Sequence, residues 1–405
     1  MPRTIPLIIS QVALTLPVII SGLLAGCAQP VTPVQKSPPA LLAVEEQKQL
    51  SLAFNQRLDR QKRVLDLSYP ILAAGSELCS DKTRLSMGFT FSNKQATEEK
   101  FRDTAIRDLG LGEPLQVIQV ARTSPAEKAG VLSGDILVSL NGEVFGSGKS
   151  ALQSVPPLLN SLEENRKSIL LVARQGTTTE LVITPEKICD YPVSMSSEDE
   201  VNAYADGKRI LLTKGMLRFA QEDSDLALVI AHELAHNAFA HMPKTVKNAL
   251  SGSILDLLAW SHGIPSPGVF AMGGSRVHLQ GFEMEADYVA LYLLARSGYP
   301  IEESANFWRR VATEYPEQIK DKGSDNLAAT HPSSPARFLA METTVKEIRE
   351  KQAANKPLLP EQLNTSFANA QSSSATSEDS AAQKARQAKA LSPNNENMTS
   401  GMPLL

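Results

Sequence analysis

The stretch LVIAHELAHNAFAH, residues 228–241, constrains this chain more than any other, because it places three histidines and a glutamate in an otherwise apolar run. Residues four apart on a helix lie on one face, so His232 and His236 can present two nitrogens to one cation. Glu233 would lie beside the open position of that cation, where hydrolysis needs a general base. The alternative is a buried helix that merely contains histidines, so a third ligand has to be identified.

The best source of a third ligand is GFEMEADYVALYLLAR, residues 281–296, an apolar segment that predicts another helix. Glu283 and Asp287 are four residues apart and share a face, whereas Glu285 points roughly 160° away from Glu283. A carboxylate that binds zinc, followed one turn later by a carboxylate that orients a ligand histidine, is the arrangement that zinc sites use.

All six histidines lie between His232 and His331, which favours a metal domain in this half of the chain. His241, His262 and His278 have no firm assignment. His241 could lie near the zinc face at the end of its helix, but we interpret it as a core or surface histidine, because three better ligands are available.

The N-terminus has a lone Arg3, then an apolar run, and then Leu24-Ala25-Gly26-Cys27. This order is typical of a secretory signal peptide over residues 1–26, and less so of a transmembrane anchor, because polar residues and a proline interrupt the run. The last four residues resemble a bacterial lipobox, which implies lipidation of Cys27 and stable membrane anchoring by several acyl chains. Ala28 follows the cysteine, which by analogy with bacterial sorting implies the periplasmic side of the outer membrane.

Several further segments are distinguished by composition. Residues 27–40 are rich in proline and predict a tether, and residues 41–78 show apolar positions at helical spacing, which predicts an amphipathic helix. Residues 353–405 contain few large apolar side chains and predict a disordered tail. A net charge of -4 and an aromatic content of 5% exclude nucleic acid as a partner class.

Residues 79–190 predict a β-rich domain, with tight turns at Asn141-Gly142 and Gln175-Gly176. The segment resembles a PDZ domain, with SMGF at residues 86–89 in the place of the carboxylate loop. The resemblance implies a peptide-binding site for C-terminal carboxylates, formed by Met87, Gly88 and Phe89. A PDZ-shaped spacer that binds no peptide is the alternative.

Lipidation of Cys27 would leave two cysteines, Cys79 and Cys189, in an exported protein where disulfides persist. The two bracket the PDZ-like segment, and the termini of such a domain lie close together. We therefore predict a disulfide at its neck, with two separate buried thiols as the alternative.

Residues 191–352 form a second candidate domain. HELAH at 232–236, followed by EMEAD at 283–287, resembles the HtpX and CAAX-prenyl-protease family of gluzincin zinc metallopeptidases, in its soluble exported branch. The resemblance implies one zinc ion, the ligands His232, His236 and Glu283, the general base Glu233, and Asp287 behind the ligands.

The resemblance continues into THPSSPAR, residues 330–337. It implies that His331 faces the active site, where it stabilises the oxyanion or caps the zinc and keeps the enzyme latent. Arg337 is predicted to assist with the oxyanion. NAYADGKRILLTKGML, residues 202–217, resembles the family's edge strand, which would align an extended substrate.

The sequence therefore predicts an α+β protein with a mainly helical zincin-type peptidase domain and a small edge-strand sheet, preceded by a β-rich PDZ domain. The predicted function is a zinc endopeptidase that cleaves misfolded or mis-assembled envelope proteins, which the PDZ module would capture. The alternative is a latent, lipid-anchored assembly factor or chaperone of the outer membrane, whose zinc site His331 holds shut.

Overall fold

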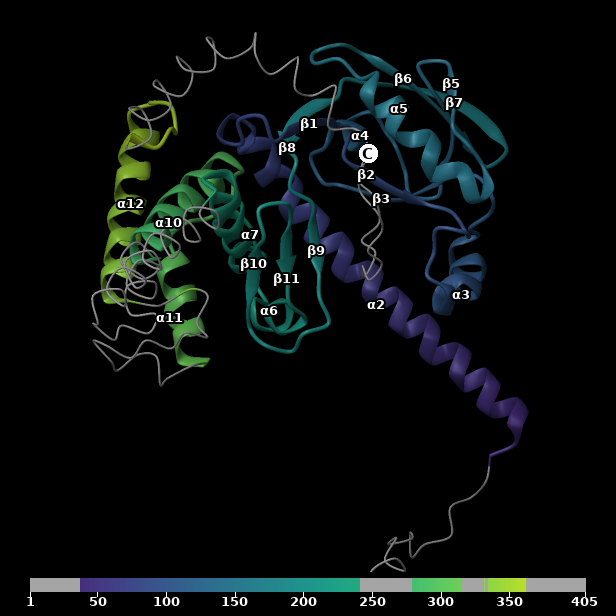
Figure 1. The fold of residues 1–405 in the computed structure, drawn as a ribbon, viewed down its shortest axis with the longest axis horizontal. Helices are drawn as coiled ribbons and strands as arrows, with labels where there is room; N and C mark the ends of the chain where they lie inside the picture. The colour runs from purple at the N-terminus through teal and green to yellow at the C-terminus, as the bar shows by residue number, and fades with distance from the viewer. Residues whose placement is uncertain (1–36, 241–278, 315–330, 332–333, 362–405) are drawn as a thin grey trace, which may run out of the picture. The chain divides into compact units, whose positions relative to one another are not determined.

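The computed structural model describes residues 37–240, 279–314, 331 and 334–361 (Figure 1). The predicted signal peptide, Cys27, nearly all of the tether, and His241, His262 and His278 lie outside these residues. Contacts divide the chain into two compact units, Met1–Leu50 and Ser51–Leu405. Within the described ranges, the helices lack the combination of length and apolar character needed to cross a membrane.

A helix, α2 (Pro39–Ala74), runs through the segment where the sequence predicts an amphipathic helix. Its last part is buried, and residues from Val64 to Leu72 belong to the same hydrophobic core as the peptidase region. Arg63 donates to the carbonyl oxygens of Ala220 and Gln221. The second half of α2 is therefore part of a folded core and is followed by a short 3-10 helix, η1 (Ser76–Leu78).

The PDZ-like region is an antiparallel sheet of order β2-β3-β4-β6-β7, with β5 paired to β4. Its elements are β1 (Thr83–Ser86), β2 (Phe89–Ser92), α3 (Glu99–Leu109), β3 (Gln116–Val120), α4 (Pro125–Lys128), β4 (Ile136–Leu140), β5 (Glu143–Val144), η2 (Gly148–Ser154), α5 (Val155–Asn160), β6 (Ser168–Arg174), β7 (Thr177–Ile183) and β8 (Glu186–Cys189). The β6–β7 hairpin turns at Gln175 and Gly176, whose φ angles of 50° and 80° suit a primed turn.

The beginning and end of this region are joined twice. Strand β1 pairs antiparallel with β8, so that Thr83 lies opposite Cys189. Cys79 and Cys189 form a disulfide with a Cα–Cα distance of 5.6 Å. The bridge therefore closes the PDZ-like region at the place where the sequence predicts it.

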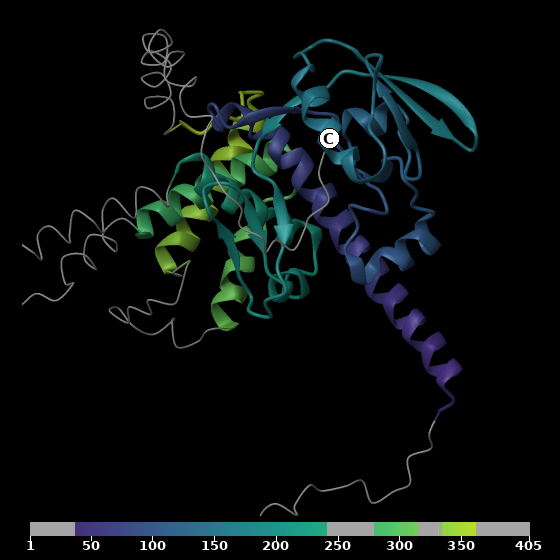
Figure 2. The same cartoon turned by 45° about the vertical axis from the view of Figure 1, so that its right-hand side comes forward.

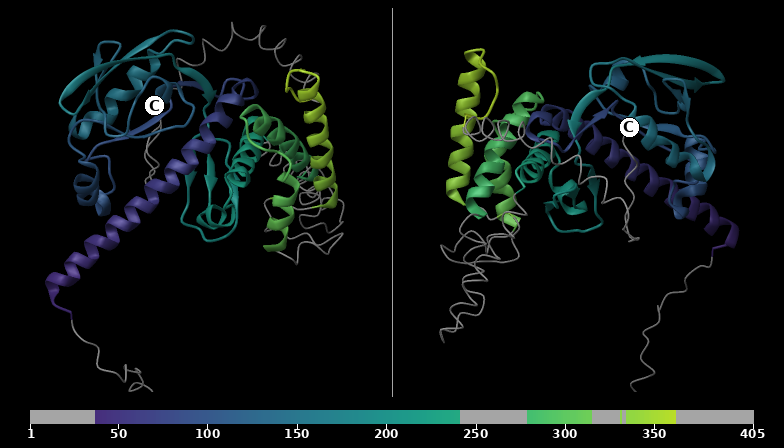
Figure 3. Two further views of the ribbon diagram at one scale, coloured as in Figure 1. Left: turned by 180° about the vertical axis from the view of Figure 1, so that it is seen from behind. Right: turned by 45° about the horizontal axis from the view of Figure 1, so that its top comes forward.

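The peptidase region combines helices with one small sheet (Figures 1 and 2). Its elements are β9 (Val193–Met195), β10 (Ala203–Ala205), β11 (Ile210–Leu212), α6 (Lys214–Phe219), α7 (Asp223–Ala238), α10 (Leu279–Arg296), α11 (Ser304–Glu314) and α12 (Pro335–Ala353). The sheet order is β10-β11-β9, with β10 antiparallel and β9 parallel to β11. Helix α10 packs between α7 and α12, as the two views of Figure 3 also show. The α+β class with a β-rich PDZ region and a helical peptidase region is confirmed.

The peptidase core extends slightly further than the sequence suggests. Lys351 Nζ donates to the carbonyl oxygen of Leu359 at 2.8 Å, and the amide of Glu361 donates to the Tyr288 hydroxyl at 3.0 Å. Residues 354–361, which composition assigns to the tail, thus contact α10 and α12, because a buried lysine and a tyrosine supply partners for their backbone.

Candidate metal centre and active site

Helix α7 carries the HELAH motif and is almost entirely buried. From Leu226 to Ala235 its residues are at most 1% exposed, including His232 and Glu233. Two packing partners explain this, since α10 covers one side of α7 and the β10–β11 hairpin contacts it as well. A helix buried on several sides needs apolar residues around most of its circumference, which is why the motif lies in such an apolar run.

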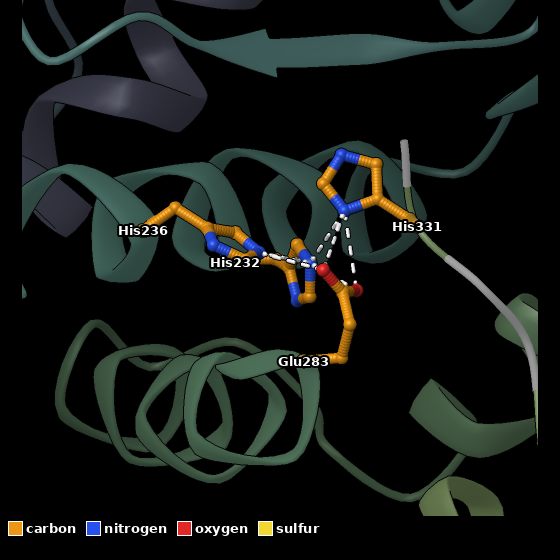
Figure 4. A group of neighbouring side chains, drawn as sticks. All are labelled: His232, His236, Glu283 and His331. Atoms are coloured by element: carbon orange, nitrogen blue, oxygen red, sulfur yellow. Dashed lines mark hydrogen bonds and ion pairs between the residues drawn. The ribbon is translucent and has the colours of Figure 1, made fainter. Parts of the chain in front are cut away.

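Four donor atoms converge beside α7: Nε2 of His232, Nε2 of His236, a carboxylate oxygen of Glu283 and Nδ1 of His331, all within 4.8 Å of one another. The two motif histidines come from α7, Glu283 reaches in from α10, and His331 approaches from the segment before α12 (Figure 4). The sequence analysis takes three of these residues as ligands and His331 as a residue that faces the site or caps the zinc, and in the structure His331 Nδ1 lies among the donors.

The distances between donors test whether the cluster fits zinc. A tetrahedral site with metal–ligand bonds of about 2.0–2.1 Å has edges of about 3.3 Å. His232 Nε2 lies 3.3 Å from His331 Nδ1 and 3.0 Å from His236 Nε2. Glu283 oxygens lie 3.2 Å from His331, 3.3 Å from His236 and 3.4 Å from His232. The distances from His232 and from Glu283 to the other donors are therefore close to the edges of a zinc tetrahedron, and the nitrogen and oxygen donors are ones that zinc accepts.

Behind the donors, Asp287 and Arg337 form a buried support. Asp287 Oδ1 lies 3.0 Å from His232 Nδ1, which turns Nε2 of that imidazole toward the cluster. Arg337 donates to both oxygens of Asp287 at 2.8 and 2.9 Å, and its Nη1 lies 3.0 Å from Glu283. Arg337 is 1% exposed and engaged with these carboxylates, so in this structure it supports the predicted ligands. Its role at the oxyanion stays a prediction.

Trp308 completes this support and was missed by the sequence analysis. Its ring centroid lies 5.0 Å from that of His232, and the Arg337 guanidinium lies 5.5 Å from the same ring. The indole thus packs against both a candidate ligand and its support. An aromatic side chain at a core position of an amphipathic helix gives no signal of this role, since such residues usually only fill a core.

Glu233 is 1% exposed, and neither of its carboxylate oxygens makes a well-formed hydrogen bond to the residues that the structure describes. Nε2 of His331 lies 3.3 Å from its Oε1. A buried carboxylate without hydrogen-bond donors is costly unless it serves a purpose, and proton transfer is the purpose that the HExxH pattern suggests.

Without a metal ion the cluster is strongly charged. Burial by itself lowers the pKa of His232, but hydrogen bonds to Asp287 and Glu283 outweigh it and raise that pKa to about 9. Burial raises the pKa of Glu283, yet His331 and Arg337 together hold it well below its usual range. His236 differs, because burial keeps its pKa below the ordinary value. Carboxylates that stay ionised beside imidazoles suit a cation between them.

The PDZ loop presents a different environment. Met87 and Phe89 are fully buried. The Gly88 amide donates to the Ser86 hydroxyl at 3.2 Å, and a Cβ at Gly88 would lie 2.2 Å from that of Ser124 and 2.9 Å from the Tyr69 ring. Only glycine fits there, and in this conformation the amide that the resemblance assigns to a peptide carboxylate is already engaged.

Fold and site together define a metallopeptidase domain of the HExxH type behind a PDZ domain. Comparison with known families identifies both parts: residues 177–345 match peptidase family M48 and residues 116–172 match a PDZ domain. This chain therefore contains an M48 peptidase domain fused to a PDZ domain.

Curated relatives are similar over the peptidase part. The mitochondrial metalloendopeptidase OMA1 of Saccharomyces cerevisiae is 28% identical over 36% of this chain and 43% of its own length. OMA1 of Arabidopsis thaliana is 32% identical, over 39% of this chain and 32% of that protein. The beta-barrel assembly-enhancing protease of Yersinia pestis is 27% identical, over 35% and 32% respectively. The matches span less than half the length of each of these relatives.

Proposed function

We propose that this protein is a zinc-dependent endopeptidase whose metal centre is closed at rest by His331. The observation that carries the proposal is the convergence of four nitrogen and oxygen donors within 4.8 Å of one another, with His232 Nε2 3.0 Å from His236 Nε2 and 3.3 Å from His331 Nδ1. Hydrolytic zinc sites use three protein ligands and keep one position open for water, whereas a fourth protein donor closes the site. His232, His236 and Glu283 would hold the zinc ion, and His331 Nδ1 would have to leave the fourth position before a substrate enters.

Zinc at such a site polarises a carbonyl group and lowers the pKa of water. Glu233 takes a proton from the attacking water and then gives it to the leaving amine. Before displacement, His331 Nε2 lies 3.3 Å from Glu233 Oε1. A displaced His331 that remained beside Glu233 would be able to donate to the oxyanion. Asp287 and Arg337 keep His232 in one orientation throughout.

The proposed substrates are misfolded or mis-assembled envelope proteins. Three observations support this location: the signal-like N-terminus with the lipobox-like Cys27, the disulfide between Cys79 and Cys189, which suits an oxidising compartment, and the name of the Yersinia pestis relative. We propose that lipid on Cys27 holds the protein at the periplasmic side of the outer membrane. Capture of substrates by the PDZ module stays a prediction, and it would require the Gly88 amide to exchange Ser86 for a carboxylate.

A second candidate function is a latent assembly factor or chaperone with a structural zinc ion. The fourth donor, His331, favours it, because closed sites of four protein ligands are typical of structural zinc. The two proposals share the metal and differ in whether the site ever opens.

The test uses zinc content and casein cleavage of the purified protein, its Glu233→Gln variant and its His331→Ala variant. The peptidase proposal predicts one zinc per chain in all three, a loss of about 10²–10⁴-fold in rate for Glu233→Gln, and a gain for His331→Ala. Zinc without cleavage, even in His331→Ala, would favour the assembly factor. Absence of zinc would refute both.

A further inference from the structure

Asn237 follows His236 on α7, is 4% exposed, and contacts the β10–β11 hairpin through both ends of its amide. Its Oδ1 accepts a hydrogen bond from the Gly207 amide at 2.7 Å. Its Nδ2 donates to the carbonyl oxygen of Arg209 at 3.0 Å. One side chain thus joins the helix of the metal centre to the turn of the edge-strand hairpin.

The turn does not need Asn237 in order to form. Asp206 Oδ1 accepts hydrogen bonds from the amides of Lys208 and Arg209 at 2.9 and 2.8 Å. Gly207 supplies the left-handed conformation at a φ of 81°. The two bonds from Asn237 are therefore attachments between hairpin and helix, beyond what closes the turn.

Strand β10 begins the order β10-β11-β9, so one of its edges is unpaired within the described residues. The amide of Thr213 donates to Asn202 at 3.2 Å and the amide of Asp206 donates to Arg209 at 3.3 Å. Along an antiparallel strand, successive residues direct their N–H and C=O groups to opposite edges. Because Asn202 and Asp206 bond to the residues on either side of β11, Ala203 and Ala205 direct their N–H and C=O groups away from β11. The Ala203 amide already donates to Asn202 Oδ1 at 2.9 Å, so the Ala205 amide and the carbonyl oxygens of both residues are the groups that can pair with an extended peptide by strand addition.

The attachment lies on a particular side of α7. Asn237 is four residues after Glu233, so both side chains point to the same face, one turn apart. The hairpin is consequently held on the face of the candidate general base. Sliding of the hairpin along α7 would move any peptide on β10 relative to Glu233, and a shift by one residue would also exchange the two faces of that peptide.

We propose that Asn237 is a positioning residue that fixes the register of a peptide bound on β10 relative to Glu233. Its consequence for cleavage rests on the proposed peptidase function, whereas its consequence for peptide binding does not. The two can be measured separately.

Binding is measured by fluorescence anisotropy with labelled β-casein and the zinc-loaded full chain carrying Glu233→Gln and His331→Ala, so that the site is open and inactive. Addition of Asn237→Ala should weaken binding about tenfold, because a hairpin that has lost both bonds to α7 has to be ordered when the peptide binds. Asn237→Asp, which keeps the acceptor for Gly207, should weaken it less. Asn306→Ala, the same truncation at an exposed site on α11, should leave binding unchanged.

Cleavage provides a readout that a merely structural role would not change. In the His331→Ala protein, Asn237→Ala should redistribute casein cleavage to neighbouring peptide bonds, as seen by mass spectrometry, with one zinc per chain retained. Unchanged affinity and unchanged bonds would overturn the proposal, as would loss of zinc in both Asn237→Ala and Asn237→Asp, which would make the residue a support of His236. If Asn237→Ala weakens binding but the His331→Ala protein cleaves no casein, the result would contradict the peptidase function and still support the role of Asn237 in peptide binding.

Discussion

The metal cluster and the PDZ loop are both regions where sequence patterns predict a ligand, and they differ in how their polar groups are satisfied. In the cluster, three imidazoles and two carboxylates face one another, and Glu233 lacks well-formed hydrogen bonds to the described residues. In the loop, the Gly88 amide already donates to Ser86, and the Tyr69 hydroxyl donates to the Ser86 carbonyl oxygen at 3.4 Å. Because unsatisfied buried polar groups are costly, the first arrangement calls for a cation and the second is self-sufficient.

The largest expected effect concerns the support of the cluster. Arg337→Ala leaves Asp287 and Glu283 buried without their guanidinium partner, so the free energy of unfolding of the metal-free protein should fall by about 3–5 kcal/mol. Urea denaturation measures this. Arg349→Ala, whose ion pair with Glu302 is about half exposed, is the matched control and should cost no more than about 1 kcal/mol. Equal effects of the two variants would show that the buried carboxylates of the cluster do not depend on Arg337 as their partner.

The disulfide closes the PDZ-like region, so its removal tests whether that region and the metal centre depend on each other. Replacement of both Cys79 and Cys189 by serine removes a cross-link over a sequence separation of 110 residues and should cost about 2–4 kcal/mol in thermal or urea unfolding. Zinc content should be unchanged, since the donors lie outside this segment. Loss of zinc together with the bridge would mean that the PDZ-like region and the metal centre do not hold their structures independently.

The charge of the ion-free cluster predicts how zinc binding depends on pH. The pKa of His232 is raised to about 9, and zinc needs the neutral imidazole, so binding must release this proton. Zinc affinity should therefore increase with pH by at least about tenfold per pH unit, and more steeply where His331, whose pKa is lowered by burial but raised on balance by Glu283 and Glu233, also releases a proton. Competition with a chromophoric chelator between pH 6.5 and 8.5 measures the slope. Asp287→Asn removes the main hydrogen bond that raises the pKa of His232 and should flatten the dependence. A flat dependence in the unmodified protein would contradict the charges described here.

The smallest effect is expected at the PDZ loop. If the Gly88 amide stays with Ser86, a hydrophobic peptide with a free C-terminal carboxylate should bind less than about threefold more tightly than the same peptide with a C-terminal amide. Isothermal titration with both peptides measures the difference. A preference above tenfold for the free acid would show that the loop opens. The Gly88 amide would then be available to a ligand, and the loop would be self-sufficient only in its closed conformation.

Much of the metal centre could be predicted from sequence because its central spacing is local. His232 and His236, or Glu283 and Asp287, share a face whenever their segment is helical, whatever the rest of the fold does. The β6–β7 turn and the PDZ resemblance follow from similar short-range patterns. The extent of the tail was less predictable, since Lys351 and Tyr288 supply partners to residues 354–361 that composition alone does not reveal.

By itself the sequence determined which residues carry chemistry and which helical faces they share. Only the tertiary structure decided how those faces meet: His331 lies 99 positions from His232, and Arg337 lies 50 from Asp287. The roles of His331, Arg337 and Trp308, and the engagement of the Gly88 amide, depend on contacts between distant segments. No periodicity encodes such contacts, because each arises from the packing of whole elements and from the need of every buried charge to find a partner.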